Sequence, residues 1–106
     1  MNNRISYKEF ENYPKFENRE AAVKWLEEKY GEDFYFSREG KLDNEPYYIY
    51  NYVLNREVFI RMQEYLIKRD RPSWVSNDPE TKGFGDSFQE IHIRDDGKVE
   101  VIGPSN

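Results

Sequence analysis

The sequence predicts a single α+β domain over residues 1–106, with an antiparallel sheet of about four strands, a central helix at 56–69 packed on one face, and further helices near the N-terminus. Three observations lead to this fold class. A chain of 106 residues has the usual size of one domain. Segments with helical periodicity come before and between segments rich in aromatic and β-branched residues. The last two strand-like segments are joined by a short Asp-Asp-Gly turn, which is typical of a hairpin.

Aromatic residues supply much of the expected core. Tyr, Phe and Trp total 18 residues, against 17 for Ile, Val and Leu together. Charged residues make up 35% of the chain and the mean hydropathy is −1.07, values that on their own indicate disorder. A buried aromatic side chain, however, removes about 150–250 Å² from water. We therefore expect a folded chain with a modest core that includes Phe34, Phe36, Phe59 and Tyr65.

Two helices are predicted in the first third of the chain. Ser6 and Glu9 have capping-box spacing, in which each side chain satisfies a free backbone N–H group, and Pro14 ends this short helix over 7–12. The second helix begins after Asn18 and closes at Gly31. Its apolar side chains recur at helical spacing and comprise Ala22, Val23, Leu26 and Tyr30.

A β-hairpin is predicted to follow. Residues 34–38 are short and β-prone, residues 39–46 supply a polar turn, and residues 47–54 form the longest β-like run. Side chains of 47–54 are apolar or amphipathic on both faces of the strand. This strand is therefore expected at the centre of the sheet.

Residues 56–69 have the clearest helical pattern, with one broad apolar stripe and cations in the last turn. Ile60 and Ile67 lie on the opposite side. Either a partner or a second copy of the chain covers these two residues, or other parts of the monomer bury them; we favour burial within the monomer. The main stripe consists of Val58, Phe59, Met62, Tyr65 and Leu66.

Residues 70–87 are predicted to form a long loop, because prolines and glycines interrupt any periodic pattern. So long a loop in a compact domain is usually functional or disordered. Trp74 and Val75 are expected to anchor its first part, and Pro79 to begin a helical turn.

The chain is predicted to end in a hairpin whose register can be derived. A three-residue loop over 95–97, with Gly97 in the left-handed conformation, pairs Ile93 with Val99 and Ile91 with Val101. A two-residue loop would mix the apolar and polar faces. The outer face then carries Glu90, His92, Arg94, Lys98 and Glu100.

Charge and composition narrow the classes of partner. The formal net charge is −5 and neither half of the chain is basic, so nonspecific nucleic-acid binding is disfavoured. No apolar run approaches the length of a membrane span, and no signal peptide is recognised, so we expect a cytoplasmic protein with no membrane association. Cysteine is absent, which leaves no thiolate chemistry.

Catalytic and metal-binding patterns are weak. His92 is expected to face Glu100 across the hairpin as a surface ion pair. Glu80-Thr81-Lys82, preceded by Asp70 or Asp78, resembles the Asp…Glu-x-Lys arrangement with which some nucleases hold Mg²⁺, but the surrounding Pro and Gly argue against a rigid strand. We therefore predict no catalytic residue, no metal ligand and no cofactor.

The tyrosines of the central strand are the main functional candidates. Tyr48, Tyr50 and Tyr52 project from one face as a row, and Trp74 and Phe84 are expected to border it. Either these five residues bind a partner protein, or the first two helices cover the row as a second core layer; the pattern favours the helices.

We expect a non-enzymatic protein-binding module, an accessory regulator or inhibitor that is a monomer or a weak homodimer. The alternative is a nucleic-acid-related protein, either a single-strand binder that uses the tyrosine row or an acidic mimic of DNA. A small Mg²⁺-dependent hydrolase that uses residues 78–82 is the third hypothesis.

Overall fold

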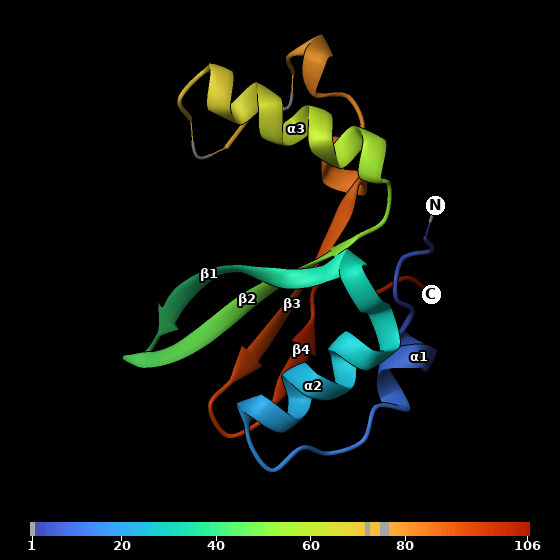
Figure 1. Cartoon of the computed structure of the whole chain (residues 1–106), viewed down its shortest axis with the longest axis vertical. Helices are drawn as coiled ribbons and strands as arrows, with labels where there is room; N and C mark the ends of the chain where they lie inside the picture. The colour runs from blue at the N-terminus through green and yellow to red at the C-terminus, as the bar shows by residue number, and fades with distance from the viewer. Residues whose placement is uncertain (1, 72, 75–76) are drawn as a thin grey trace.

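The computed structural model describes residues 2–71, 73–74 and 77–106, and it contains one four-stranded antiparallel sheet in the order β1-β2-β3-β4 (Figure 1). The predicted α+β class is confirmed. Helices α1 and α2 precede the sheet in sequence, and α3 connects its two hairpins. The strands are β1 (Phe34–Leu42), β2 (Glu45–Val53), β3 (Phe88–Arg94) and β4 (Val99–Val101).

The predicted N-terminal helices are confirmed as α1 (Tyr7–Glu11) and α2 (Arg19–Tyr30). The Ser6 hydroxyl accepts a hydrogen bond from the Glu9 backbone N–H at 3.1 Å, and the side-chain Oδ1 of Asn18 accepts one from the Ala21 backbone N–H at 2.9 Å. These bonds satisfy donors that a helix start leaves free. α2 buries Ala22 and Leu26 against the sheet.

The core has two parts, one between α2 and a face of the sheet and one between the strand ends and α3, so the 56–69 helix does not pack on a face of the sheet as expected. Successive strand side chains alternate between faces: Tyr52 belongs to the cluster beneath α2, whereas Val53 belongs to the cluster beneath α3. The first cluster comprises Ile5, Ala22, Leu26, Phe34, Tyr50, Tyr52, Leu54, Ile91, Ile93 and Val101. The second comprises Val53, Phe59, Met62, Tyr65 and Phe84.

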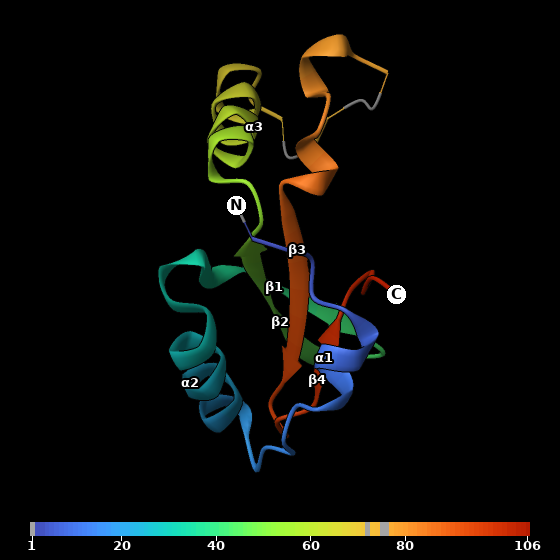
Figure 2. The ribbon, with the colours of Figure 1, turned by 90° about the vertical axis from the view of Figure 1, so that its right-hand side faces the viewer.

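Helix α3 (Arg56–Lys68) lies at one end of the molecule, beyond the strand ends, together with the segment that carries η2 and η3 (Figures 1 and 2). Its N-cap is Asn55, whose side-chain oxygen accepts from the Val58 N–H group at 3.3 Å. The 3-10 helices η2 (Pro79–Thr81) and η3 (Phe84–Asp86) fall within the predicted loop 70–87. They pack beside α3 and leave a groove between them.

The first hairpin differs from its prediction. The turn consists of Asp43 and Asn44 only, and both have positive φ angles of 53° and 68°, as a two-residue turn between twisted strands requires. Strand β1 therefore continues through Leu42. Gly40, which indicated a turn in the sequence, instead leaves room for the Tyr47 ring, since a Cβ atom there would lie 2.6 Å from Tyr47 Cζ.

The last hairpin has the predicted register. Ile93 pairs with Val99, Ile91 pairs with Val101, and Gly97 has a φ angle of +90°. The apolar side chains therefore share the face that α2 covers, and the charged ones share the other face.

Three apolar side chains are more exposed than expected. Ile60 and Ile67 are 45% and 80% exposed, so the favoured prediction that the monomer buries them is wrong. α3 contacts the rest of the chain through its opposite side, where Phe59, Met62 and Tyr65 are buried. Phe36 was predicted in the core, but it lies on the edge strand β1 and half of its surface is exposed.

Candidate functional site

The tyrosine row lies mostly beneath α2. Tyr50 and Tyr52 are only 7% and 8% exposed. The Tyr50 ring stacks on Phe34 with centroids 5.0 Å apart, and the Tyr52 ring lies 4.4 Å from that of Tyr30. The interpretation in which the row is covered as a core layer is therefore confirmed for Tyr50 and Tyr52.

Tyr48 is the partly exposed member of the row, and an intramolecular cation covers it. The Arg19 guanidinium lies 3.6 Å from the centroid of the Tyr48 ring. This is a cation–π contact between α2 and the sheet. The exposed part of the row is thus already paired within the chain.

Trp74 and Phe84 lie in the cluster at the α3 end of the molecule, so the expectation that they border the row is wrong. Their rings meet edge to face with centroids 5.8 Å apart, and Phe84 belongs to the core beneath α3. β2 separates the two groups because its alternate side chains point to opposite faces. The five predicted contact residues form no common surface; the other predicted anchor of the loop, Val75, lies outside the described residues.

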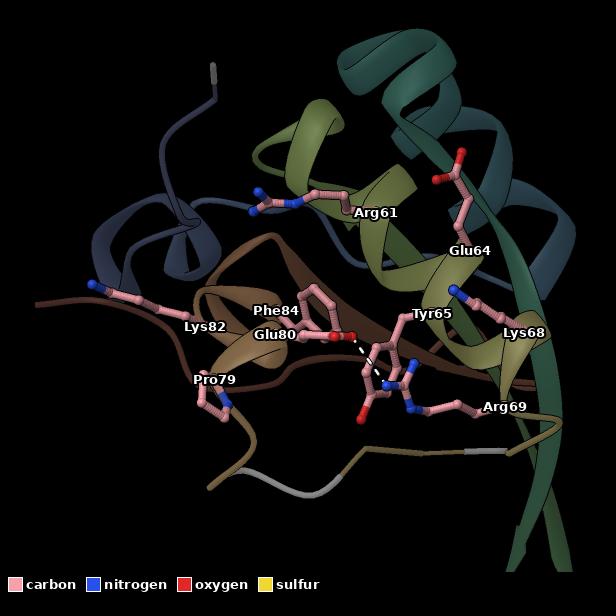
Figure 3. Close-up of a pocket in the computed structure, with 9 residues that line it drawn as sticks. All are labelled: Arg61, Glu64, Tyr65, Lys68, Arg69, Pro79, Glu80, Lys82 and Phe84. Atoms are coloured by element: carbon pink, nitrogen blue, oxygen red, sulfur yellow. Dashed lines mark ion pairs between the residues drawn. The ribbon is translucent and has the colours of Figure 1, made fainter.

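A groove between α3 and residues 79–84 has charged walls and a volume of about 570 Å³ (Figure 3). α3 forms one wall and η2 with the residues after it forms the other. The lining residues are Arg61, Glu64, Tyr65, Lys68, Arg69, Pro79, Glu80, Lys82 and Phe84.

The groove carries positive charge in an acidic protein. Four of its lining residues are cations and two are carboxylates, whereas the whole chain has a net charge of −5. In the part of the chain that the structure describes, Arg61, Lys68 and Lys82 form no ion pair. A concave site lined by one sign of charge concentrates ligands of the opposite sign.

The floor of the groove is aromatic. The rings of Tyr65 and Phe84 meet edge to face with centroids 5.4 Å apart. The Arg69 guanidinium lies 4.2 Å from the centroid of the Tyr65 ring, and its Nη2 atom lies 3.1 Å from Glu80 Oε2 (dashed in Figure 3). Both rings are buried, so they support the cationic donors of the groove from the core side.

Asp78 holds two of the residues that line the groove. Its carboxylate accepts a hydrogen bond from the Tyr65 hydroxyl at 2.7 Å and another from the Glu80 backbone N–H at 3.0 Å. These hydrogen bonds lower the pKa of Asp78, and the same contact with Asp78 is the main cause that raises the pKa of Tyr65.

The Mg²⁺-binding arrangement of the third hypothesis is not assembled. Asp78 is bonded to Tyr65 and to the η2 backbone, and Glu80 is paired with Arg69. Within the described ranges, no cluster of three His, Cys, Asp or Glu residues is placed to hold a metal ion.

Among the described residues, no helix has the length and apolarity needed to cross a membrane.

His92 lies on the face of the sheet opposite α2, where its carboxylate partner differs from the prediction. Glu100 is directly opposite in the register, but His92 Nε2 lies 3.0 Å from Glu90 Oε1 on the same strand. The second Glu90 oxygen pairs with Arg38 at 3.3 Å. Because two residues apart on a strand share a face, Glu90 competes with the cross-strand partner.

The cations of the groove could not be recognised from the sequence, because they come from two separate segments of the chain. Arg61 and Lys68 are seven residues apart and lie on one side of α3, where they read as ordinary solvated charge. Lys82 and Glu80 reach the groove only because the loop folds back along α3.

Comparisons of the chain with protein-family models, with curated proteins and with solved structures find no match.

Proposed function

We propose that this chain is a non-enzymatic protein-binding module, an accessory regulator or inhibitor, that captures an acidic segment of a partner protein in the groove between α3 and η2. The observation that supports this function is the local excess of cations on a chain with a net charge of −5. The acidic surface elsewhere repels such a segment, so the groove is the place where it is attracted.

The chemistry of the lining fits carboxylates on a peptide. Arg61 and Arg69 offer planar guanidinium groups that match a carboxylate with two parallel hydrogen bonds. Tyr65 and Phe84 are 7% and 1% exposed, so their rings support the cationic side chains and the charged groups carry the recognition. An open groove of about 570 Å³ accepts several side chains of an extended segment.

A nucleic acid fits less well. Its phosphate backbone extends far beyond the groove and meets the net negative field of the rest of the chain. Bases would also need an exposed aromatic platform. Tyr50 and Tyr52, which the single-strand hypothesis needs, are buried beneath α2.

The test is the binding of a fluorescein-labelled oligoglutamate peptide, followed by fluorescence anisotropy at low and at physiological salt. The Arg61→Glu/Lys82→Glu variant reverses two exposed groove cations and is expected to weaken binding about tenfold. Lys24→Glu/Lys41→Glu makes the same change of charge on α2 and β1, away from the groove. Circular dichroism checks that all variants are folded.

The expected result is a loss of affinity in the groove variant alone. Equal losses in both variants would mean that net charge and not the groove governs binding. Absence of peptide binding by the wild type, or tighter binding of a labelled single-stranded oligonucleotide, would overturn the proposal in favour of another partner class.

A further inference from the structure

Arg69 and Glu80 form the one ion pair that spans the groove among the described residues. Arg69 is the C-cap residue of α3 and only 34% of its side chain is exposed, whereas 64% of the Glu80 side chain is exposed. The cation is thus fixed and the carboxylate is easily displaced.

Contacts with Tyr65 hold the Arg69 side chain in place. Its guanidinium stacks on the Tyr65 ring, which is held by the Asp78 carboxylate on one side and by the edge contact with Phe84 on the other. Asp78 also binds the backbone N–H group of Glu80. A single aspartate therefore positions both members of the pair.

We infer that Arg69 is the anchor for a carboxylate of the acidic segment and that Glu80 is a built-in competitor for the same guanidinium. This inference rests on the proposed function. The Glu80 carboxylate marks the position that a ligand carboxylate takes, because both groups present the same two oxygens to the same donors. A ligand must displace Glu80 before it binds Arg69.

The competition makes the groove selective for segments with several carboxylates. Replacing one partly exposed ion pair by another gains little, since each contributes about 0.2–1 kcal/mol. A second and third carboxylate meet Arg61, Lys68 or Lys82, which have no ion-pair partner within the described residues to displace. A peptide with a single Glu is therefore expected to bind far more weakly than oligoglutamate.

The test compares Glu80→Gln with Glu64→Gln in binding of the labelled oligoglutamate peptide. Both substitutions remove one negative charge from the groove lining, but only Glu80 is paired with Arg69. Glu80→Gln is expected to tighten binding about two- to fivefold, and Glu64→Gln distinctly less. In an Arg69→Gln background the gain from Glu80→Gln should disappear.

A spectroscopic readout separates an anchor from a residue that only supports the fold. The side-chain Nε–H signal of Arg69, assigned from its absence in Arg69→Gln, is expected to shift when the peptide is added to the wild type.

Equal tightening by Glu80→Gln and Glu64→Gln, or an Arg69 signal that does not move, would refute the competition while leaving the groove as the binding site. If the wild type does not bind the peptide at all, the proposed function fails first. The two failures are therefore distinguishable.

Discussion

The side-chain amide of Gln89 is bonded in both directions to the backbone of Ile5. Gln89 Oε1 accepts the Ile5 N–H group at 2.7 Å, and Gln89 Nε2 donates to the Ile5 carbonyl at 3.3 Å. The same Nε2 atom donates to the carbonyl of Ile102 at 3.1 Å. Gln89 is 1% exposed, so one buried amide on β3 joins the segments next to both chain ends to the sheet.

Gln89→Leu is expected to lower the free energy of unfolding by about 2–4 kcal/mol, because it leaves buried backbone groups without partners. Urea unfolding followed by circular dichroism measures the change. Gln63→Leu, at an exposed position on α3, is the matched control and should cost less than about 1 kcal/mol. A loss below that level at Gln89 would show that the amide is not a structural link.

Features set by local chemistry were predictable from the sequence. The caps Ser6 and Asn18 act within one helical turn, and the register of the last hairpin follows from the left-handed Gly97 together with the alternation of apolar residues. Each depends on contacts between residues close in the chain, so a single sequence contains the whole signal.

Features set by distant contacts were not predictable. Which face of β2 becomes the core beneath α2 depends on how the helix docks, and the buried state of Tyr50 and Tyr52 follows from that docking. The groove needs Arg61 from α3 and Lys82 from the loop after η2 to meet. No periodic pattern in the sequence indicates that these two segments form one groove. Exposed cations are also common on any protein surface, so their presence alone predicts nothing.

The stability of the fold is expected to fall in acid partly through Asp33. A hydrogen bond from Asn2 at 2.9 Å and the ion pair with Arg56 hold the pKa of Asp33 below its ordinary value of 3.8. As pH falls, Asp33 is protonated in the unfolded state before it is protonated in the folded state. Its contribution to the free energy of unfolding is therefore complete above the unfolded pKa and is lost as pH falls through the folded pKa.

Asp33→Asn should therefore unfold more easily than the wild type at neutral pH and lose less stability between about pH 5 and pH 2. Urea unfolding at a series of pH values measures both slopes. Glu28→Gln, at an exposed position on α2, controls for the loss of one negative charge. Parallel slopes for the wild type and Asp33→Asn would contradict the assignment.

Alkaline pH is expected to destabilise the contact between α1 and α2. The Tyr30 hydroxyl donates to the Glu9 carboxylate and also contacts the Tyr13 hydroxyl. Burial is the main cause that raises the pKa of Tyr13 to about 12, and burial with the Glu9 contact raises the pKa of Tyr30 above its ordinary value of 10.0. The folded state thus keeps protons that the unfolded state releases, and stability falls as pH rises beyond 10.0.

Tyr30→Phe should flatten this alkaline decline, although it lowers stability at neutral pH by removing the bond to Glu9. Unfolding free energies between about pH 8 and pH 11 test the slope. Tyr7→Phe, at an exposed position, should leave the decline in place. The same decline in Tyr30→Phe as in the wild type would exclude this tyrosine as its source.

Gly97 is expected to tolerate substitution less well than Gly31. It has a φ angle of +90°, and a Cβ atom there would lie 2.5 Å from the Phe16 carbonyl oxygen and 2.9 Å from the Asn18 backbone nitrogen. Backbone atoms cannot move aside as a flexible side chain does. Gly97→Ala should therefore separate the hairpin from the start of α2 and lower the free energy of unfolding by about 2–4 kcal/mol.

Gly31→Ala is the matched control, because Gly31 also has a positive φ angle, of +64°, but its added Cβ atom would meet nothing within 4 Å. It carries the conformational penalty alone, about 1–3 kcal/mol, because its φ of 64° and ψ of −141° lie in a region that L side chains rarely adopt. Thermal and urea unfolding of both variants measure the difference that close approach adds. Equal losses in the two variants would mean that the contact with Phe16 relaxes freely, and that the strain at Gly97 comes from its backbone angle only.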